Sequence, residues 1–224
     1  MFGIFTRILF TINSLYNFLL CSYHLLTHQP KTFNFNGENF NYFMHPYNFT
    51  WRNERIIEVP IIRKLILNNE GKNILEVGNV LSHYFKINHD IFDKYEKGDK
   101  VINKDIVDFK SKKKYDLIIS ISTLEHIGWD EPEKDNKKGL KAIKKMKSLL
   151  KRKGKMIFTI PLGYNPFIDK YIKNNQINFS EKFFLIRISS KNIWQQSSWN
   201  LVKNIKYNYP FPYANGVVIG VINK

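Results

Sequence analysis

The feature that most constrains the fold is a series of short, nearly continuous apolar segments that alternate with helical patterns. Residues 73–78, 89–94 and 115–122 are such segments, and residues 155–161 form another after helical spacing over residues 140–150. Strands that are apolar at almost every position are typical of parallel sheets buried on both faces. The sequence therefore predicts an α/β fold with a mostly parallel sheet flanked by helices.

The end of the chain follows a different pattern. Residues 183–189 and 216–222 are apolar enough for strands, but no pattern of helix length separates them. We expect them to form an antiparallel hairpin at the edge of the sheet, because parallel neighbours need a long crossover. With a weaker strand at residues 100–103, the prediction is a seven-stranded sheet.

An N-terminal extension precedes this domain, with predicted boundaries of 1–70 for the extension and 71–224 for the α/β domain. Residues 3–27 are apolar and aromatic with an approximate helical stripe, interrupted by Arg7 and by polar side chains. We expect a helix that packs on the domain or lies at a membrane surface. A membrane-spanning helix is the alternative, since a span needs about 20 mostly apolar residues. The predicted location is the cytoplasm, with membrane association through this helix left open.

The rest of the extension, from residue 32 to residue 50, is rich in aromatic residues and asparagine. Asn36-Gly37 predicts the turn of a short hairpin, because both residues tolerate the positive φ that tight hairpin turns need. A helical pattern then begins at residues 53–55 and ends near Gly71.

The net charge of +16 raises the question of nucleic-acid binding. Only six of the 35 basic residues are arginine, the residue that most often reads bases and binds phosphates through two hydrogen bonds. We therefore favour a solvated lysine surface and a small-molecule partner, with nucleic acid as the weaker alternative. The single cysteine excludes an intrachain disulfide, and the six histidines lack the spacing of a metal site.

Acidic residues and a glycine stand at the predicted carboxyl ends of the first three strands. Gly78 ends the first strand, Asp93 lies 17 residues after Glu76, and Asp105-Ile106 follow the third strand. In open α/β sheets, ligands bind outside these strand ends, where a glycine allows close approach and a carboxylate can accept ribose hydroxyls. The sequence therefore predicts a nucleoside site at this edge. Taken singly, Glu76 could instead cap the next helix, and Asp93 could be a solvated charge.

These segments together resemble the class I S-adenosylmethionine-dependent methyltransferases. The resemblance covers about residues 72–161 and rests on ILEVG, KDIVDF, YDLIISISTLEHIG and GKMIFTIP in the family's order and spacing. It implies a Rossmann-like fold, S-adenosylmethionine as cofactor, and methyl transfer to a small molecule or to a glycan or lipid intermediate. The cofactor-binding residues that it implies are Glu76, Gly78, Asn79, Asp93, Asp105, Ile106 and Ser120.

The resemblance also implies a role for each of these positions. Glu76 would orient the loop after the first strand, and Gly78 would let the cofactor pass. Asp93 would bind the ribose, while Asp105-Ile106 would hold the adenine. Residues from Ser120 to Glu125 would face the methionine part and the acceptor.

The glycine loop departs from the family's pattern E-x-G-x-G-x-G, because Val80 and Ser82 replace two glycines. S-adenosylmethionine has no phosphate to place against a helix start, so one close approach at Gly78 suffices. Asn79 can tolerate a positive φ where a glycine is missing. The alternatives are a domain of this fold that has lost its cofactor, and a nucleic-acid-associated methyltransferase.

Glu125 and His126, just past the fourth strand, are the predicted catalytic residues. A histidine titrates near neutral pH and can take the proton of an acceptor that must lose one. The structural alternative is that His126 packs on Trp129, and weaker candidates are His45, Glu54 and Asp169. The segments expected to shape the acceptor site are residues 42–55, 163–166 and 194–213.

Overall fold

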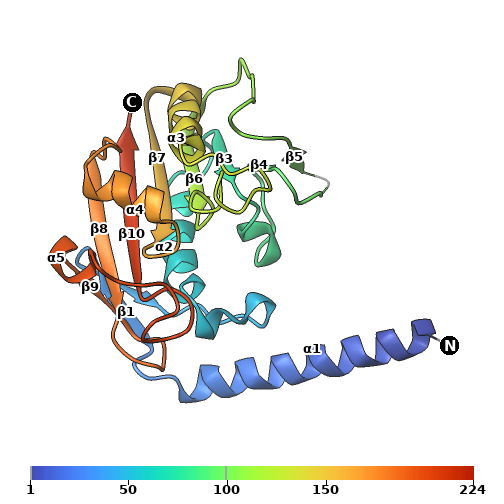
Figure 1. The fold of residues 1–224 in the computed structure, drawn as a ribbon. Helices are drawn as coiled ribbons and strands as arrows, with labels where there is room; N and C mark the ends of the chain where they lie inside the picture. The colour runs from blue at the N-terminus through green and yellow to red at the C-terminus, as the bar shows by residue number, and fades with distance from the viewer. Residues whose placement is uncertain (1, 99) are drawn as a thin grey trace.

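The central feature of the fold is one eight-stranded sheet (Figure 1). The computed structural model describes the backbone of residues 2–98 and 100–224, and the side chains of residues 15–98 and 100–224. The strands of the sheet are β3 (Ile74–Val77), β4 (Asp90–Asp93), β5 (Val101–Asn103), β6 (Tyr115–Ile121), β7 (Leu150–Pro161), β8 (Glu181–Arg187), β9 (Trp194–Ser197) and β10 (Gly216–Asn223). Their order across the sheet is β5-β4-β3-β6-β7-β10-β8-β9.

The sheet is parallel from β5 to β7 and antiparallel from β7 to β9. The predicted α/β class, mostly parallel sheet and antiparallel C-terminal pair are therefore confirmed. The predicted number of seven strands is wrong, because β9 adds an eighth beside β8. In β9 only Trp194 is apolar, and Gln195 and Gln196 are exposed, so this edge strand lacks the alternation that predicts a strand.

The strand order reverses beside β3, which lies between β4 and β6. The chain runs outward from β3 to β4 and β5, then returns to the other side of β3 as β6. These strands are parallel, so their carboxyl ends share one edge of the sheet. Ligands of open α/β sheets bind in the crevice at such a reversal of strand order, and this fold places a reversal beside β3.

Helices cover both faces of the sheet (Figure 1). On one face lie α3 (Lys138–Leu149) and α4 (Pro166–Lys173), and on the other lies α2 (Arg55–Leu67). Along β6, Ile118 enters the core with α3, while Leu117 and Ile119 enter the core with α2. This burial on both faces explains why the central strands are apolar at nearly every position.

The aromatic hairpin covers the same face as α2. Its strands, β1 (Thr32–Phe35) and β2 (Glu38–Asn41), pair antiparallel across Asn36-Gly37, with φ values of 51° and 80°. The hairpin and its turn are therefore confirmed, as is the helix predicted to begin at residues 53–55. The buried aromatic side chains of the hairpin are Phe33, Phe35 and Phe40.

The N-terminal helix α1 (Phe2–Thr27) extends away from the sheet (Figure 1). Near its C-terminal end, Cys21 is buried and the His24 ring stacks on Trp51 with 5.4 Å between centroids. Exposed apolar side chains of α1 include Leu15, Phe18 and Leu19. The predicted helix is confirmed, and it packs on the domain near this end. In the part of the chain that the structure describes, no helix combines the length and apolarity needed to cross a membrane.

Two connections differ from their predicted form. The helix expected to start at residues 81–85 is a single 3₁₀ turn, η2 (Leu81–His83), because the chain leads on into β4. The turn expected at residues 152–154 lies inside β7, where Lys153 has a φ of 65° and the pairing with β6 shifts. The remaining short helices are η1 (Tyr47–Arg52) and α5 (Trp199–Val202).

Candidate active site

A cleft of about 370 Å³ opens at the carboxyl ends of β3, β4 and β6, where the strand order reverses. Its lining comes from the segments that follow these strands and β5. The lining residues are 77–80, 92–96, 104–106, 123, 126, 127, 130 and 131. Of the predicted site residues, the cleft brings together Gly78, Asn79, Asp93, Asp105, Ile106 and His126.

Gly78 forms part of the cleft wall and has a φ of 90°. Its N–H donates to Phe92 O at 2.8 Å, which ties the loop after β3 to the end of β4. A Cβ at this position would lie 2.1 Å from Thr123 Oγ1. Both the backbone conformation and the available space therefore require glycine.

The loop that follows is held by Glu76, which is fully buried. Glu76 Oε1 accepts hydrogen bonds from the N–H groups of Val80 and Leu81 at 2.9 and 2.8 Å, and Oε2 lies 2.8 Å from His89 Nε2. Glu76 therefore orients the loop from behind the cleft. Val80 has a φ of −109°, which any residue adopts, so the loop does not need a glycine there. Asn79 is not among the described residues with positive φ.

Asp93 lies at the end of β4 and connects two loops of the cleft. Its Oδ2 accepts from the N–H of Asn79 at 3.0 Å, and its Oδ1 accepts from the N–H groups of Tyr95 and Glu96 at 2.8 Å each. A carboxylate offers about four acceptor positions, so three backbone donors leave capacity for one donor from a ligand. Sequence reasoning placed Asp93 at the cleft but did not anticipate these backbone contacts.

Asp105 belongs to a network of four charged side chains at the cleft. Its Oδ2 lies 2.6 Å from Lys138 Nζ and 3.0 Å from Lys94 Nζ, and both lysines also pair with Glu131 Oε2. Burial alone would raise the pKa of Asp105, but hydrogen bonds from Lys138, Val107 N–H and Lys94 outweigh it and lower this pKa. Beside the network, Ile106 is buried and adds apolar surface.

The cleft is acidic although the chain carries a net charge of +16. The carboxylates among its lining residues are Asp93, Glu96, Asp105, Asp130 and Glu131, and the lysines are Lys94 and Lys104. Lys138 adds a third lysine from beside the lining, through its pairs with Asp105 and Glu131, and five carboxylates against three lysines still favour a ligand with positive charge. The same balance opposes a pyrophosphate.

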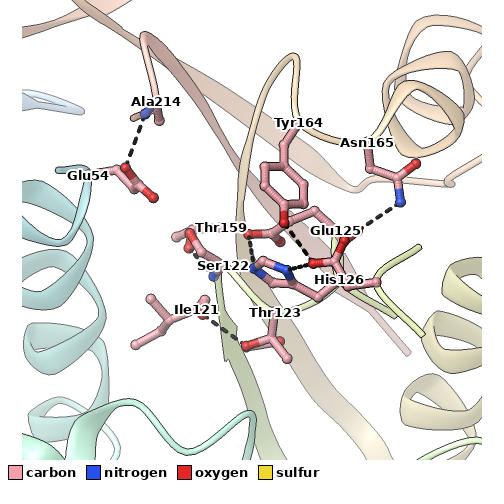
Figure 2. Close-up of polar contacts among 12 residues, drawn as sticks. Glu54, Ile121, Ser122, Thr123, Glu125, His126, Thr159, Tyr164, Asn165 and Ala214 are labelled. Atoms are coloured by element: carbon pink, nitrogen blue, oxygen red, sulfur yellow. Dashed lines mark hydrogen bonds and ion pairs between the residues drawn. The ribbon is translucent and has the colours of Figure 1, made fainter. Parts of the chain in front are cut away.

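His126 is among the lining residues of the cleft, and its neighbour Glu125 is not. Figure 2 shows the two side chains together with Tyr164. The His126 side chain is 46% exposed, and its Nδ1 lies 2.5 Å from Asp130 Oδ2, which also accepts from the Tyr164 hydroxyl at 2.7 Å. Glu125 is 1% exposed, with Oε1 3.6 Å from His126 Nε2. Desolvation raises the pKa of Glu125 well above its ordinary value. The His126 ring contacts the Tyr164 ring at 4.8 Å, a contact that the Trp129 alternative did not anticipate.

Ser120 lies in the interior of the sheet. It is fully buried in β6, and its hydroxyl donates to Val77 O at 2.8 Å, across the junction of β6 and β3. Ser120, Glu76 and Glu125 are thus the predicted site residues that the structure places behind the cleft lining.

Sequence reasoning missed most of a buried charged cluster at the start of α2. Glu58 is fully buried, with Oε2 2.5 Å from Arg55 Nη1, and its Oε1 accepts from Ser122 Oγ at 2.6 Å. Glu54, a weaker sequence candidate, is also buried and accepts from the N–H of Ala214 at 3.2 Å (Figure 2). Ser122 has a φ of 37°, a rare conformation for a non-glycine residue that recurs at functional sites. The available signal was a pair of glutamates four residues apart, on either side of Arg55, where a helical pattern begins.

The segments expected to shape the acceptor site contribute unequally. Tyr164 and Tyr207 meet with 5.0 Å between ring centroids, near His126. Trp194, in contrast, is buried with its Nε1 donating to Asn192 Oδ1, and Trp199 packs on Phe184. Trp194 therefore belongs to the core and Trp199 packs against it, while the tyrosines border the candidate site.

The fold of the chain is similar to that of S-adenosylmethionine-dependent methyltransferases of known structure. The N-methyltransferase NodS from Bradyrhizobium japonicum WM9, in complex with S-adenosyl-L-homocysteine, shares 12% identity over 76% of this chain and 87% of its own, with a TM-score of 0.47. An S-adenosylmethionine-dependent methyltransferase from Archaeoglobus fulgidus shares 14% identity over 80% of this chain and 98% of its own, also with a TM-score of 0.47. A TehB-like methyltransferase from Corynebacterium glutamicum shares 16% identity over 72% and 85%, with a TM-score of 0.42. No protein-family model and no curated protein matches the sequence.

Proposed function

We propose that the cleft binds S-adenosylmethionine and that the protein transfers its methyl group to a small molecule or to a glycan or lipid intermediate. The observation that carries the proposal is the acidic cleft at the strand reversal, with Gly78 in its wall. S-adenosylmethionine carries a sulfonium and an ammonium charge against one carboxylate, and it has no phosphate. Its net positive charge suits a lining with five carboxylates and two lysines.

Each part of the ligand has a candidate partner in the cleft. Asp93 can accept a ribose hydroxyl with its remaining capacity, and Asp105 beside Ile106 suits an amino group and the ring of adenine. The backbone at Gly78 allows close approach, and Asp130 adds negative charge at the His126 side. The cofactor would supply a methyl group already activated by the sulfonium. The chain's own part is to position the reactants and to exclude water.

A non-catalytic domain of the same fold is the second candidate function, and a specific observation favours it. The two acidic residues expected to bind the nucleoside are already engaged, Asp93 by three backbone N–H groups and Asp105 by two lysines. A domain whose carboxylates only hold its own loops together would need no ligand. This alternative predicts no saturable binding of the cofactor.

Calorimetric titration of the full chain with S-adenosylhomocysteine distinguishes a methyltransferase from a non-catalytic domain of the same fold. We expect saturable binding at one site, weakened about tenfold or more by Asp93→Ala, because a ribose hydroxyl loses a charged acceptor. The matched control is Asp108→Ala, at an exposed aspartate outside the cleft lining, which should leave the affinity unchanged. Absence of saturable binding would remove the methyltransferase proposal, and equal loss in both variants would remove the ribose assignment.

A further inference from the structure

Three glutamates, Glu54, Glu58 and Glu125, are buried where α2 begins and β6 ends, but among the described side chains only one of them has a lysine or arginine as its ion-pair partner. Glu58 is paired with Arg55. Glu54 and Glu125 form no ion pair with lysine or arginine among the side chains of residues 15–98 and 100–224. Burial is the main cause that raises the pKa of Glu125, the charges of Glu58 and Glu54 raise it further, and the charge of Arg55 acts to lower it, so one arginine faces three glutamates in this environment. The cluster is therefore short of positive charge.

Glu125 also lacks a hydrogen-bond donor for one of its carboxylate oxygens among the side chains that the structure describes. Its Oε2 is buried and has no hydrogen-bond donor among the described residues. The backbone at this position is fixed, because Asn165 Nδ2 donates to Glu125 O at 2.8 Å and Asn165 also caps α4 (Figure 2). A buried acceptor without a donor destabilises the folded state, and more so when the group is charged. A ligand that brings a charged donor would recover this cost.

Aromatic rings border the same place. Tyr164 contacts the His126 ring at 4.8 Å and the Tyr207 ring at 5.0 Å, both edge to face. Burial raises the pKa of Tyr207, and the charges of Glu54 and Glu125 raise it further. Carboxylates and tyrosine rings together form the environment that ammonium ions favour.

We propose that the methyl acceptor is a primary or secondary amine, which binds as its ammonium ion against the Glu125 carboxylate, beside the rings of Tyr164 and Tyr207. This inference rests on the proposed methyltransferase function and names its substrate class. A neutral alcohol would not offset the deficit of positive charge. A carboxylate or phosphate ester would add negative charge to a cluster that already holds three carboxylates.

The reaction follows from the same contact. The ammonium gives one proton to Glu125, and the freed lone pair on nitrogen forms a bond to the methyl carbon. The carbon–sulfur bond breaks with its electron pair passing to sulfur, which becomes a neutral thioether, and the product is a methylated ammonium ion. The proton on Glu125 leaves past His126, whose Nε2 lies 3.6 Å away and whose side chain is 46% exposed. Glu125 is thus the proposed catalytic base, and Glu54 and Glu58 are positioning residues.

The test compares three probes of similar shape: benzylamine, benzyl alcohol and benzoate. Each is titrated calorimetrically into the full chain saturated with S-adenosylhomocysteine. We expect benzylamine to bind about tenfold or more tightly than the other two. Glu125→Gln should abolish this preference, while Glu133→Gln, at an exposed glutamate outside the site, should retain it. Incubation with labelled S-adenosylmethionine should then give N-methylbenzylamine and no methyl ether.

Thermal denaturation distinguishes a loss of binding in Glu125→Gln from a loss of folding. Glu125→Gln replaces a buried carboxyl group whose Oε2 has no hydrogen-bond donor among the described residues, so its melting temperature should be equal to or above that of the wild type. A purely structural role for Glu125 would lower the melting temperature and leave the order of the probes unchanged. The inference is overturned if benzylamine binds no better than benzyl alcohol, or if Glu125→Gln keeps the preference. Titration with S-adenosylhomocysteine alone tests the methyltransferase proposal separately, so the two failures are distinguishable.

Discussion

The Cβ atom that Gly78 lacks would lie 2.1 Å from Thr123 Oγ1, a distance that no pair of non-bonded atoms tolerates. Thr123 follows β6, and its hydroxyl donates to Ile121 O at 3.0 Å, so it has little freedom to withdraw. The ends of β3 and β6 therefore approach each other closely because position 78 carries no side chain. This contact determines the shape of the cleft wall.

Gly78→Ala should therefore damage both stability and ligand binding. Gly71 supplies the matched control, since its φ of 79° is close to the 90° of Gly78 but a Cβ added there would meet nothing within 4 Å. Alanine at 71 should cost about 1–2 kcal/mol from the left-handed conformation alone. Alanine at 78 should cost about 1–3 kcal/mol more from the clash, and it should abolish binding of S-adenosylhomocysteine. Urea denaturation and calorimetry measure the two effects, and equal losses at 71 and 78 would contradict the close approach.

Asp169 should make stability depend on pH. Burial raises its pKa to about 6, against which the N–H of Gly163 donating to Oδ2 at 2.9 Å has a smaller effect. An acid with a raised pKa in the folded state binds its proton more tightly when folded, so stability rises as pH falls through 6 towards the unfolded pKa of about 4. Asp169→Asn keeps an acceptor for Gly163 and removes the charge. It should be more stable than the wild type by about 2 kcal/mol at pH 8, and this advantage should vanish by about pH 4.

Denaturant titrations of both proteins at several pH values measure this difference. A constant offset between the two stability curves would show that Asp169 does not titrate in this range.

The buried pair of Arg55 and Glu58 should matter far more for stability than a surface pair. Glu58→Gln leaves a buried guanidinium without its carboxylate, which typically costs about 3–5 kcal/mol. Lys64 and Glu38 form the comparison, with the same 2.5 Å separation but side chains that are 44% and 55% exposed. Glu38→Gln should cost no more than about 1 kcal/mol. Denaturation midpoints in urea check both values, and similar losses would mean that solvent reaches the buried pair.

Much of the fold could be predicted because the hydrophobic pattern reports burial directly. In β6, consecutive residues such as Leu117 and Ile118 face different cores, so the strand is apolar throughout and the sheet must be covered on both sides. β9 could not be found this way, since Gln195 and Gln196 face solvent. The eighth strand is defined by its pairing with β8 at the edge of the sheet, and the hydrophobic pattern of the sequence does not report this pairing.

The site was only partly predictable for a different reason. Strand ends placed Gly78 and Asp93 at the cleft, because position along a parallel strand determines which edge a residue occupies. The partners of Asp105 could not be foreseen, since Lys138 comes from α3 and Lys94 from another loop. Glu58 was missed, and Glu54 was only a weaker candidate, because α2 lies far from β6 in sequence and meets it only in the fold. Local pattern thus located the residues of the proposed nucleoside side, and tertiary packing determined those of the proposed acceptor side.

The two lysines that pair with Asp105, Lys94 and Lys138, compete with a ligand for its carboxylate. Lys138 is 16% exposed and lies 2.6 Å from the carboxylate that we expect to accept the adenine amino group. A ligand must therefore compete with this lysine, and Lys138→Met keeps most of the apolar stem while removing the competitor. The same change removes one positive charge beside the cleft. At about 10 Å from a cationic ligand, in a medium of intermediate dielectric, this favours binding by roughly 1 kcal/mol.

Both S-adenosylmethionine and S-adenosylhomocysteine should bind more tightly to Lys138→Met, and the sulfonium charge should give S-adenosylmethionine the larger gain in affinity. The control is Lys141→Met on the same helix, whose partner Asp135 is outside the cleft lining. Calorimetry with both ligands reports the ratio of the two gains, and weaker binding by Lys138→Met would mean that the lysine itself holds the ligand.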